Sequence, residues 1–238
     1  RSVFSENWQA VIIGSSILAV IGGVILRFSV TDGPHDVKGA KFNPRYLLGA
    51  LTARGPLLTL IGYLGHQWEL YAMWARIGSF MLYVVGDRTL IGDGLDLASG
   101  LTFLVFAVGA VASSLAGMWS EKIGRTAVAS IAMVISGTVA ALIGFIPHEL
   151  TMLIVILAII WGASVIADSA QFSTAMTELS DPVYRGTMLT FQTGIGFALT
   201  AVSIWLLPIV KDSSGWGWAF AMLALGPIVG TAAMIRLR

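Results

Sequence analysis

Ionisable side chains inside long apolar segments are the residues of this sequence best suited to do chemistry. His66, Glu69 and Arg76 lie in one such segment, and Asp168 lies in another. A charged group in apolar surroundings costs about 2.5–3.5 kcal/mol, so it needs a partner, a water-filled cavity or a function. The chemistry that suits these residue types is reversible proton binding or recognition of a charged or hydrogen-bonding solute.

The spacing of the first three residues predicts a polar stripe on one helix. At about 100° per residue, Glu69 and Arg76 fall about 20° short of two full turns apart, and His66 lies one turn from Glu69. The stripe is either a solute or proton site with Arg76 as the counter-charge, or a structural salt bridge in the outer half of a bundle. Because about 10 Å along the axis separates Glu69 from Arg76, we expect partners on other helices for both.

Three further polar residues are candidates for the same kind of site. Asp168 and Gln171 are one turn apart, towards the predicted cytoplasmic end of their segment. Asp168 is either a solute or proton ligand near an inner gate or a polar partner for charges in the loops. Gln192 can bind a ligand or a neighbouring helix, and the contact between helices is the commoner role.

The sequence does not favour a metal or another cofactor. His66 and Glu69 form an H-x-x-E pattern with two possible ligands, whereas a catalytic zinc site usually has three protein ligands. The other histidines, His35 and His148, lie in predicted loops on opposite sides of the membrane. Cysteine is absent, which excludes thiol nucleophiles and Cys-ligated metals. No nucleotide-binding signature occurs, so we expect no cofactor.

Composition restricts the elements that position these residues to membrane-spanning helices. Of the 238 residues, 56% are hydrophobic and 11% are charged, whereas soluble domains have about 25% charged residues. A soluble globular domain and a disordered chain are both excluded. A net charge of +1 gives no indication of nucleic-acid binding.

Seven segments are long enough to cross a bilayer, which takes about 20 apolar residues. We therefore predict an all-α polytopic membrane protein with spans at Trp8–Phe28, Pro56–Val85, Leu97–Trp119, Thr126–Phe145, Leu150–Met176, Gly186–Ile209 and Trp216–Ile235. Turn or charge signals separate the spans, for example Lys211-Asp212-Ser213 before the last one.

Lysine and arginine predict the orientation. Ten of the 14 lie on one side, three lie on the other, and Arg76 lies within a span. The positive-inside rule makes the first side cytoplasmic. It holds the residues Arg27, Lys38, Lys41, Arg45, Arg54, Lys122, Arg125, Arg185, Arg236 and Arg238, whereas the other side holds Arg1, Arg88 and Lys211. The C-terminus is therefore expected in the cytoplasm.

The loop between the third and fourth spans carries a motif. Its sequence from Gly117 to Thr126 is GMWSEKIGRT, which resembles the major facilitator signature G-x-x-x-D-[RK]-x-G-[RK]-[RK]. The matching positions are Gly117, Lys122, Gly124 and Arg125, whereas Glu121 replaces the usual Asp and Thr126 replaces a basic residue. We expect Gly117 to allow close helix packing, Gly124 to allow a tight turn, and the charges to pair with neighbouring helices in one gate state.

The resemblance extends over the chain. Arg185-Gly186 resembles the Arg-Gly of the loop between facilitator spans ten and eleven, and the stretch 65–71 resembles an uncharacterised bacterial subgroup of facilitators. A facilitator has twelve spans, cytoplasmic termini and a long central linker. The resemblance thus implies that residues 1–28 are the last helix of an N-terminal bundle, 29–55 the cytoplasmic linker and 56–238 a C-terminal six-helix bundle. Because residue 1 is Arg, we expect that five helices preceding this sequence are missing.

The function that the resemblance implies is secondary transport of a small solute by alternating access, without enzymatic activity. Its expected partners are the solute, the lipid bilayer of a bacterial inner membrane and the missing N-terminal helices. Proton coupling through Glu69 or Asp168 is a hypothesis. A seven-span receptor or sensor is the alternative, although all four lysines lie in loops and none could bind retinal within a span.

Overall fold

The computed structural model describes residues 8–30, 44–86 and 94–238. Contacts divide the chain into two compact units, Arg1–Lys38 and Gly39–Arg238. Every regular element in the described residues is helical. Together with the apolar spans below, this confirms the prediction of an all-α polytopic membrane protein.

The first unit contains one apolar helix, α1 (Trp8–Ser29), which corresponds to the first predicted span. Its two adjacent serines, Ser15 and Ser16, both donate their hydroxyl hydrogen bonds to the carbonyl oxygen of Ile12. The hydroxyls are thus satisfied within the helix, as a helix in lipid requires. Arg27 lies in the last turn, where the helix dipole favours a positive charge.

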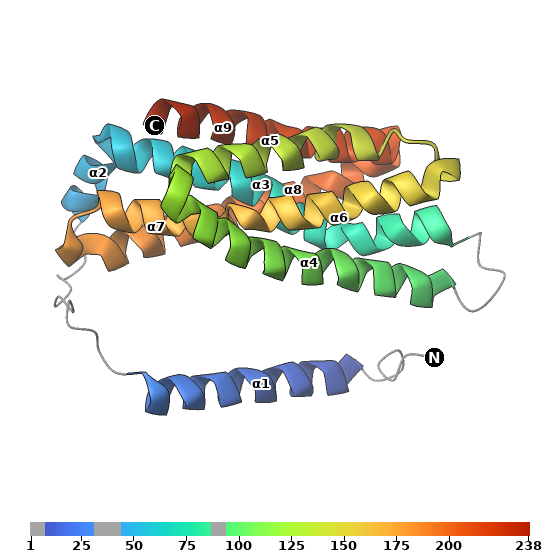
Figure 1. The fold of residues 1–238 in the computed structure, drawn as a ribbon, viewed down its shortest axis with the longest axis horizontal. Coiled ribbons are helices and arrows are strands. Elements are labelled where there is room, and N and C mark those ends of the chain that lie inside the picture. The colour runs from blue at the N-terminus through green and yellow to red at the C-terminus, as the bar shows by residue number, and fades with distance from the viewer. Residues whose placement is uncertain (1–7, 31–43, 87–93) are drawn as a thin grey trace. The chain divides into compact units, whose positions relative to one another are not determined.

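The second unit is a bundle of helices that run along a common direction (Figure 1). Its helices are α2 (Pro44–Thr52), α3 (Arg54–Val85), α4 (Gly94–Ile123), α5 (Arg125–Ile143), α6 (Thr151–Ala167), α7 (Ser169–Leu179), α8 (Arg185–Ala221) and α9 (Leu225–Leu237). Short 3₁₀ turns lie at His148–Leu150, Pro182–Tyr184 and Met222–Ala224. Helix α2 lies within the predicted linker, and residues 31–43 of that linker are outside the described residues.

Five segments of the described chain are long and apolar enough to cross a membrane. They are Gln9–Ser29, Gly94–Ile123, Arg125–Ile143, His148–Leu179 and Pro182–Leu237. The last segment has 56 residues and contains the final two predicted spans. Helix α3 is not among the five, because its ionisable and amide side chains lower its hydropathy.

Two details of the predicted spans differ from the structure. The fifth span was predicted to be continuous, but the helix is interrupted at Asp168, between α6 and α7. The backbone N–H of Gln171 donates to the carbonyl of Asp168 at 2.9 Å, a tighter turn than an α-helix makes. The stretch Lys211–Ser213 was predicted to be a turn but is helical. The chain bends instead at Gly215, whose φ of 82° is a conformation that glycine adopts without steric cost.

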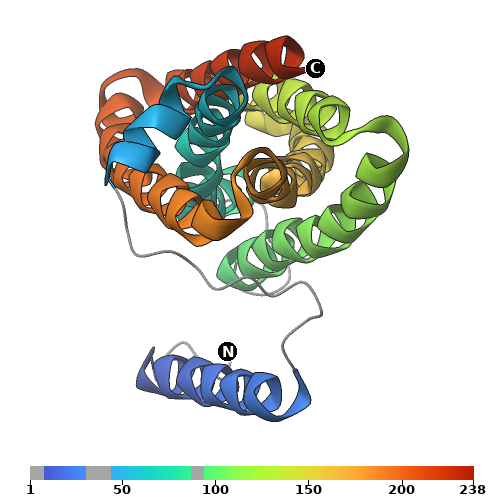
Figure 2. The same cartoon turned by 90° about the vertical axis from the view of Figure 1, so that its left-hand side faces the viewer.

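Helix α3 lies in the interior of the bundle, in contact with α4, α8 and α9 (Figure 2). More than half of its residues are buried. It crosses α9 closely, because a side chain at Gly65 would collide with the backbone of Gly226 and Gly230. Small residues at such crossings let helix backbones approach and gain van der Waals contact in a membrane.

Helix α4 packs mainly against α6, also contacts α3 and α5, and leaves many of its side chains exposed. The close contact is between Gly109 and Gly162, where an added Cβ on either glycine would meet backbone of the other helix. Beyond this crossing, large apolar side chains such as Phe103 and Val111 point outward. The outer surface of α4 is therefore suited to lipid or to another apolar helix.

Candidate functional site

Glu69 is buried at the centre of the bundle and accepts two hydrogen bonds. The indole Nε1 of Trp161 on α6 donates to its Oε1 at 2.6 Å, and the hydroxyl of Ser136 on α5 donates to its Oε2 at 2.8 Å. The side chain is 1% exposed. No lysine or arginine of the described residues forms an ion pair with it. Both oxygens accept from neutral donors, so a negative charge on this carboxyl group would have no lysine or arginine paired with it.

His66 and Asp168 form a second buried polar contact, between α3 and the break that separates α6 from α7. Nδ1 of His66 lies 2.9 Å from Oδ1 of Asp168, at an alignment outside that of a hydrogen bond. Both side chains are at most 2% exposed. Asp168 therefore lies against the imidazole of His66 in the interior. The alternative that it pairs with charges in the loops does not describe this structure.

Aromatic rings enclose the His66 side of this contact. The ring of Phe172 on α7 lies 5.5 Å from that of His66 and 6.2 Å from that of Tyr63. The hydroxyl of Tyr63 accepts a hydrogen bond from Nε2 of Gln67 at 2.5 Å. The rings shield the imidazole from water, which strengthens its electrostatic interaction with the Asp168 carboxylate.

Several buried amides of α3, α7 and α8 have unpartnered atoms. These atoms are Oε1 of Gln67, Oε1 of Gln171, and both Oε1 and Nε2 of Gln192. All three side chains are at most 3% exposed. Buried polar groups are normally hydrogen-bonded, so these amides are able to bind a solute, an ion or water. Gln192 does not make the contact to a neighbouring helix that its residue type favours.

Arg76 does not meet Glu69, although the two share a face of α3. No acidic side chain of the described residues forms an ion pair with Arg76, and its Nε is buried without a hydrogen-bond partner. The expectation that Glu69 would find its partners on other helices holds, but those partners are a serine and a tryptophan. The three residues of the predicted stripe thus do not share one site. Glu69 binds Ser136 and Trp161, and His66 lies against Asp168. Arg76 forms no ion pair among the described residues.

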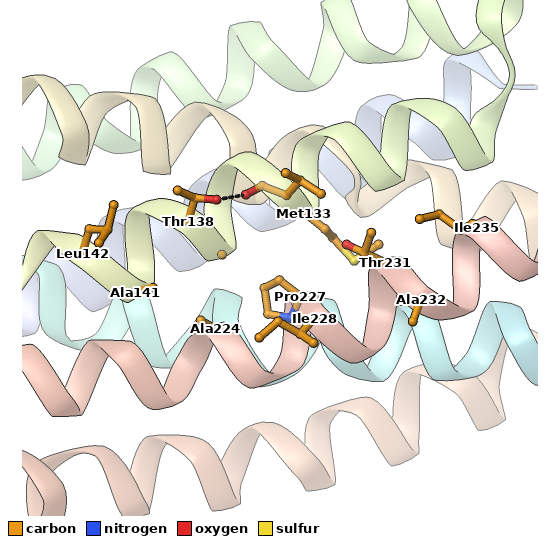
Figure 3. A pocket seen from close by; sticks show the side chains of 12 residues that line it. Met133, Thr138, Ala141, Leu142, Ala224, Pro227, Ile228, Thr231, Ala232 and Ile235 are labelled. Carbon is orange, nitrogen blue, oxygen red and sulfur yellow. Dashed lines mark hydrogen bonds between the residues drawn. The ribbon is translucent and has the colours of Figure 1, made fainter.

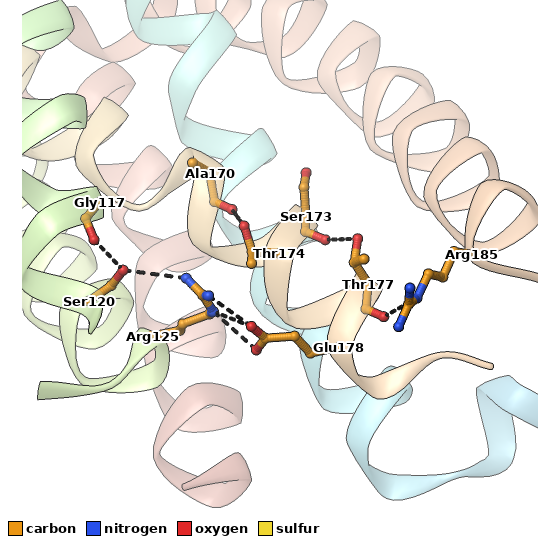
Figure 4. A network of polar contacts seen from close by, with 9 residues as sticks. All are labelled: Gly117, Ser120, Arg125, Ala170, Ser173, Thr174, Thr177, Glu178 and Arg185. Atoms are coloured by element: carbon orange, nitrogen blue, oxygen red, sulfur yellow. Dashed lines mark hydrogen bonds and ion pairs between the residues drawn. The ribbon is translucent and has the colours of Figure 1, made fainter. Parts of the chain in front are cut away.

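At one end of the bundle, Arg125 in the motif loop binds Glu178 on α7 (Figure 4). Nε of Arg125 lies 2.9 and 3.0 Å from the two carboxylate oxygens of Glu178, and Nη2 lies 2.7 Å from Oε1. Nη1 also donates to the hydroxyl of Ser120 at 3.4 Å. The side chains are 30% and 55% exposed, so this ion pair is a rim contact that ties the α4–α5 turn to α7.

The two motif glycines differ in role. Gly124 has a φ of 92°, so it makes the tight turn that was predicted. Gly117 was expected to allow close helix packing, but no atom lies within 4 Å of the position its Cβ would take. No other described helix crosses α4 closely at this point, so the expected packing stays a prediction. Glu121 and Lys122 are exposed.

The second loop with the Arg-Gly pair lies close to the same rim. Nε of Arg185 donates to the carbonyl oxygen of Thr177 at 3.0 Å, one residue before Glu178 in α7 (Figure 4). Gly186 is exposed, with open space around its Cα. Arg125 and Arg185 thus both hold the C-terminal turn of α7, whose remaining carbonyl groups favour cations.

A groove between α5 and α9 is apolar and contains no ionisable residue (Figure 3). Its volume is about 550 Å³, and its walls include Gly137 and Leu142 from α5 and Pro227 and Ile228 from α9. Its only hydroxyl groups are those of Thr138 and Thr231, so it offers few of the polar groups that fix a solute in place. Among the described residues, no group of three or more His, Asp or Glu side chains could hold a metal ion.

The sequence did not predict three contact partners in these sites, Ser136, Trp161 and Glu178. Ser136 is one hydroxyl in an apolar helix, and serine in such a helix commonly bonds its own backbone, so no signal distinguished it. Glu178 did carry a signal, because an acidic residue at the basic end of a bundle is a natural partner for a motif arginine.

Comparisons with known proteins cover most of the bundle. The protein-family model described as "Sugar (and other) transporter" matches residues 61–238, which is more than half of the chain and includes both buried sites and the rim. A comparison with curated proteins gives no match.

Proposed function

The chain belongs to the sugar (and other) transporter family, a family of major facilitators whose members are membrane transporters and not enzymes, and we propose that it carries a small polar solute by proton-coupled alternating access. The observation that carries the coupling is the buried carboxylate of Glu69 without a cation. A proton is the smallest species that neutralises this charge, and it needs no cavity.

The His66–Asp168 contact is the proposed link between the proton and the solute. It joins α3 to the break between α6 and α7, where a helix interruption leaves the backbone free to bend. Gln67, Gln171 and Gln192 supply unpartnered amides on the helices around it. Protonation of Asp168 would weaken the attraction to His66 and release α7 from α3.

We propose that the Arg125–Glu178 ion pair keeps the cytoplasmic end of the bundle closed in one state of the same cycle. It holds α7 against the α4–α5 turn in the structure, and it lies at the end of the bundle that the lysines and arginines predict to be cytoplasmic. In the proposal, bending at Asp168 carries the far end of α7 away from this turn. The ion pair is formed in one state and broken in the other.

The test is solute uptake into liposomes that contain the purified protein and a pH gradient. A panel of sugars, small organic acids and organic cations is screened first, and the transported solute is then used with the Glu69→Gln variant. We expect uptake by the variant to become independent of the pH gradient, while solute binding in the absence of a gradient is retained.

Asp212→Asn is the matched control, because Asp212 is an exposed acid of α8 that pairs with the neighbouring Lys211 and with no buried residue. Its uptake should respond to the gradient as the unsubstituted protein does. Unchanged proton flux in Glu69→Gln would contradict coupling through Glu69. Failure of every solute in the panel to be taken up would contradict the transport of a small polar solute.

A further inference from the structure

Helices α3 and α7 are in contact, and two of their contacts show how they are aligned. His66 lies against Asp168, the residue at which the chain turns into α7. Four residues earlier in α3 and four residues later in α7, Gly62 lies against the ring of Phe172. The two contacts are about one helical turn apart on both helices, so the helices run antiparallel and both contacts belong to one register.

The same register continues towards the rim of the bundle. Seven residues further along both helices, a Cβ at Gly55 would lie 3.3 Å from the side chain of Leu179. Between the two glycine contacts, the spacing pairs Thr59 with Ala175, and both of these side chains are buried. Steps that alternate between four and three residues on both helices are typical of a closely packed seam.

The contact at Gly62 leaves no room for a side chain. A Cβ there would lie 2.8 Å from Cε1 of Phe172 and 2.6 Å from the terminal methyl group of Met234. The methionine side chain is flexible and can move aside. The ring of Phe172 is completely buried, so it can leave this space only if α7 moves with it. Glycine at position 62 therefore allows α7 to lie where Asp168 reaches His66.

We propose that Gly62 and Gly55 are positioning residues, which hold α7 in the register that sets Asp168 against His66. This inference rests on the proposed function, in which the His66–Asp168 contact links the proton to the solute. Phe172 lies one turn beyond the break in the helix, so a bend at Asp168 has to withdraw its ring from Gly62. The return of the ring to the same place restores the contact between the acid and the imidazole.

Other alignments of α7 on α3 are excluded by size. A shift of α7 by about one turn towards the rim would set the ring of Phe172 against Thr59. The side chain of Thr59 occupies the space that is open at Gly62, and overpacking of this kind is destabilising. The large side chains of α7 thus fit the glycines of α3 in one register.

The labelling of an introduced cysteine by a water-soluble maleimide tests the proposal, because the chain has no cysteine of its own. Ala175→Cys places the reporter at a buried position of α7. We expect Gly62→Ala to raise its labelling rate by about tenfold, the factor that corresponds to about 1.4 kcal/mol of overpacking. Gly78→Ala is the matched control in α3, because a Cβ there meets Thr102 at 3.5 Å, an ordinary contact. Its labelling rate should not change.

Three further variants distinguish positioning from a general loss of stability. Ala158→Cys, buried in α6 on the other side of the break, should stay unreactive in Gly62→Ala. Adding Phe172→Leu to Gly62→Ala should restore the slow labelling of Ala175→Cys, since the smaller side chain leaves room for the new methyl group. Gly55→Ala meets only a flexible, exposed side chain and should give a smaller rise, which can be measured even if Gly62→Ala does not fold.

Uptake driven by a pH gradient connects the register to coupling. Gly62→Ala should weaken the response to the gradient, and Phe172→Leu should restore it. Unchanged labelling of Ala175→Cys in Gly62→Ala, no restoration by Phe172→Leu, or a full gradient response with α7 displaced would overturn the proposal. Labelling needs neither a solute nor a gradient. If labelling follows the expectation but the unsubstituted protein shows no gradient-driven uptake, the positioning of α7 stands and the proposed function is contradicted.

Discussion

Helices α3 and α4 are neighbours of similar length, yet their side chains are distributed in opposite ways. α3 carries His66, Glu69 and Arg76 and buries more than half of its residues. α4 is apolar through most of its length, with charges only near its ends, and buries few residues, among them Val105 and Gly109. The more polar helix is enclosed by the bundle, and the more apolar helix covers its edge.

The difference follows from the solvent. In water, apolar side chains are driven into the interior, but lipid tails solvate an apolar helix as well as a protein interior does. Ionisable groups gain most from enclosure, because only other helices can give them hydrogen bonds at bilayer depth. The contrast between α3 and α4 is thus expected of a membrane bundle, and three substitution pairs test it.

The largest effect is expected from the same change, Gly to Leu, on the two helices. Gly65→Leu places a side chain against the backbone of Gly226 and should destabilise the bundle by more than about 3 kcal/mol, since the backbone cannot yield as a flexible side chain does. Gly100→Leu on α4 meets open space and should be neutral or stabilising by up to about 1 kcal/mol. Denaturant titration in mixed micelles measures both free energies of unfolding.

If Gly100→Leu proved as damaging as Gly65→Leu, α4 would be packed against a helix at that position, and its exposed face would not be a lipid surface. A fluorescence-detected gel filtration profile checks that each variant is monodisperse before the titration is interpreted.

The sequence predicted where most of the long helices lie and which of their residues are unusual, because both depend on local composition and spacing. Hydropathy located the spans, and the helical period placed His66 and Glu69 one turn apart. It could not show that Asp168 meets His66, since that contact joins residues about 100 positions apart and depends on how α6 bends. The bend at Gly215 was equally hidden, because Lys211–Ser213 has the more polar composition but stays helical.

A smaller effect is expected from removing an indole N–H inside the bundle and at its surface. Trp161→Phe leaves Oε1 of Glu69 without its donor, which should destabilise the fold by about 1–3 kcal/mol, the cost of an unsatisfied buried acceptor. Trp119→Phe on the exposed side of α4 should change the stability by less than about 0.5 kcal/mol. The free energies of unfolding are compared under the same conditions.

Uptake distinguishes this loss from a general weakening of the fold. Trp161→Phe should alter the response of uptake to the pH gradient, because the changed hydrogen bonding acts on the carboxylate of Glu69. An unaltered response together with an unaltered stability would mean that the hydrogen bond from Trp161 is of no consequence, and the contrast between the two helices would then rest on packing alone.

The smallest effect is expected at the rim, where the end of α4 becomes polar and partly exposed. A double-mutant cycle with Arg125→Gln and Glu178→Gln should give a coupling energy of about 0.2–1 kcal/mol, the range for pairs screened by water. Salt should reduce this coupling, because the Debye length falls from about 10 Å at 0.1 M to about 3 Å at 1 M. A coupling well above 1 kcal/mol that is insensitive to salt would show that the pair is enclosed, as Glu69 is. The Arg125–Glu178 pair would then be shielded from water like the buried groups of α3, and unlike the exposed surface of α4.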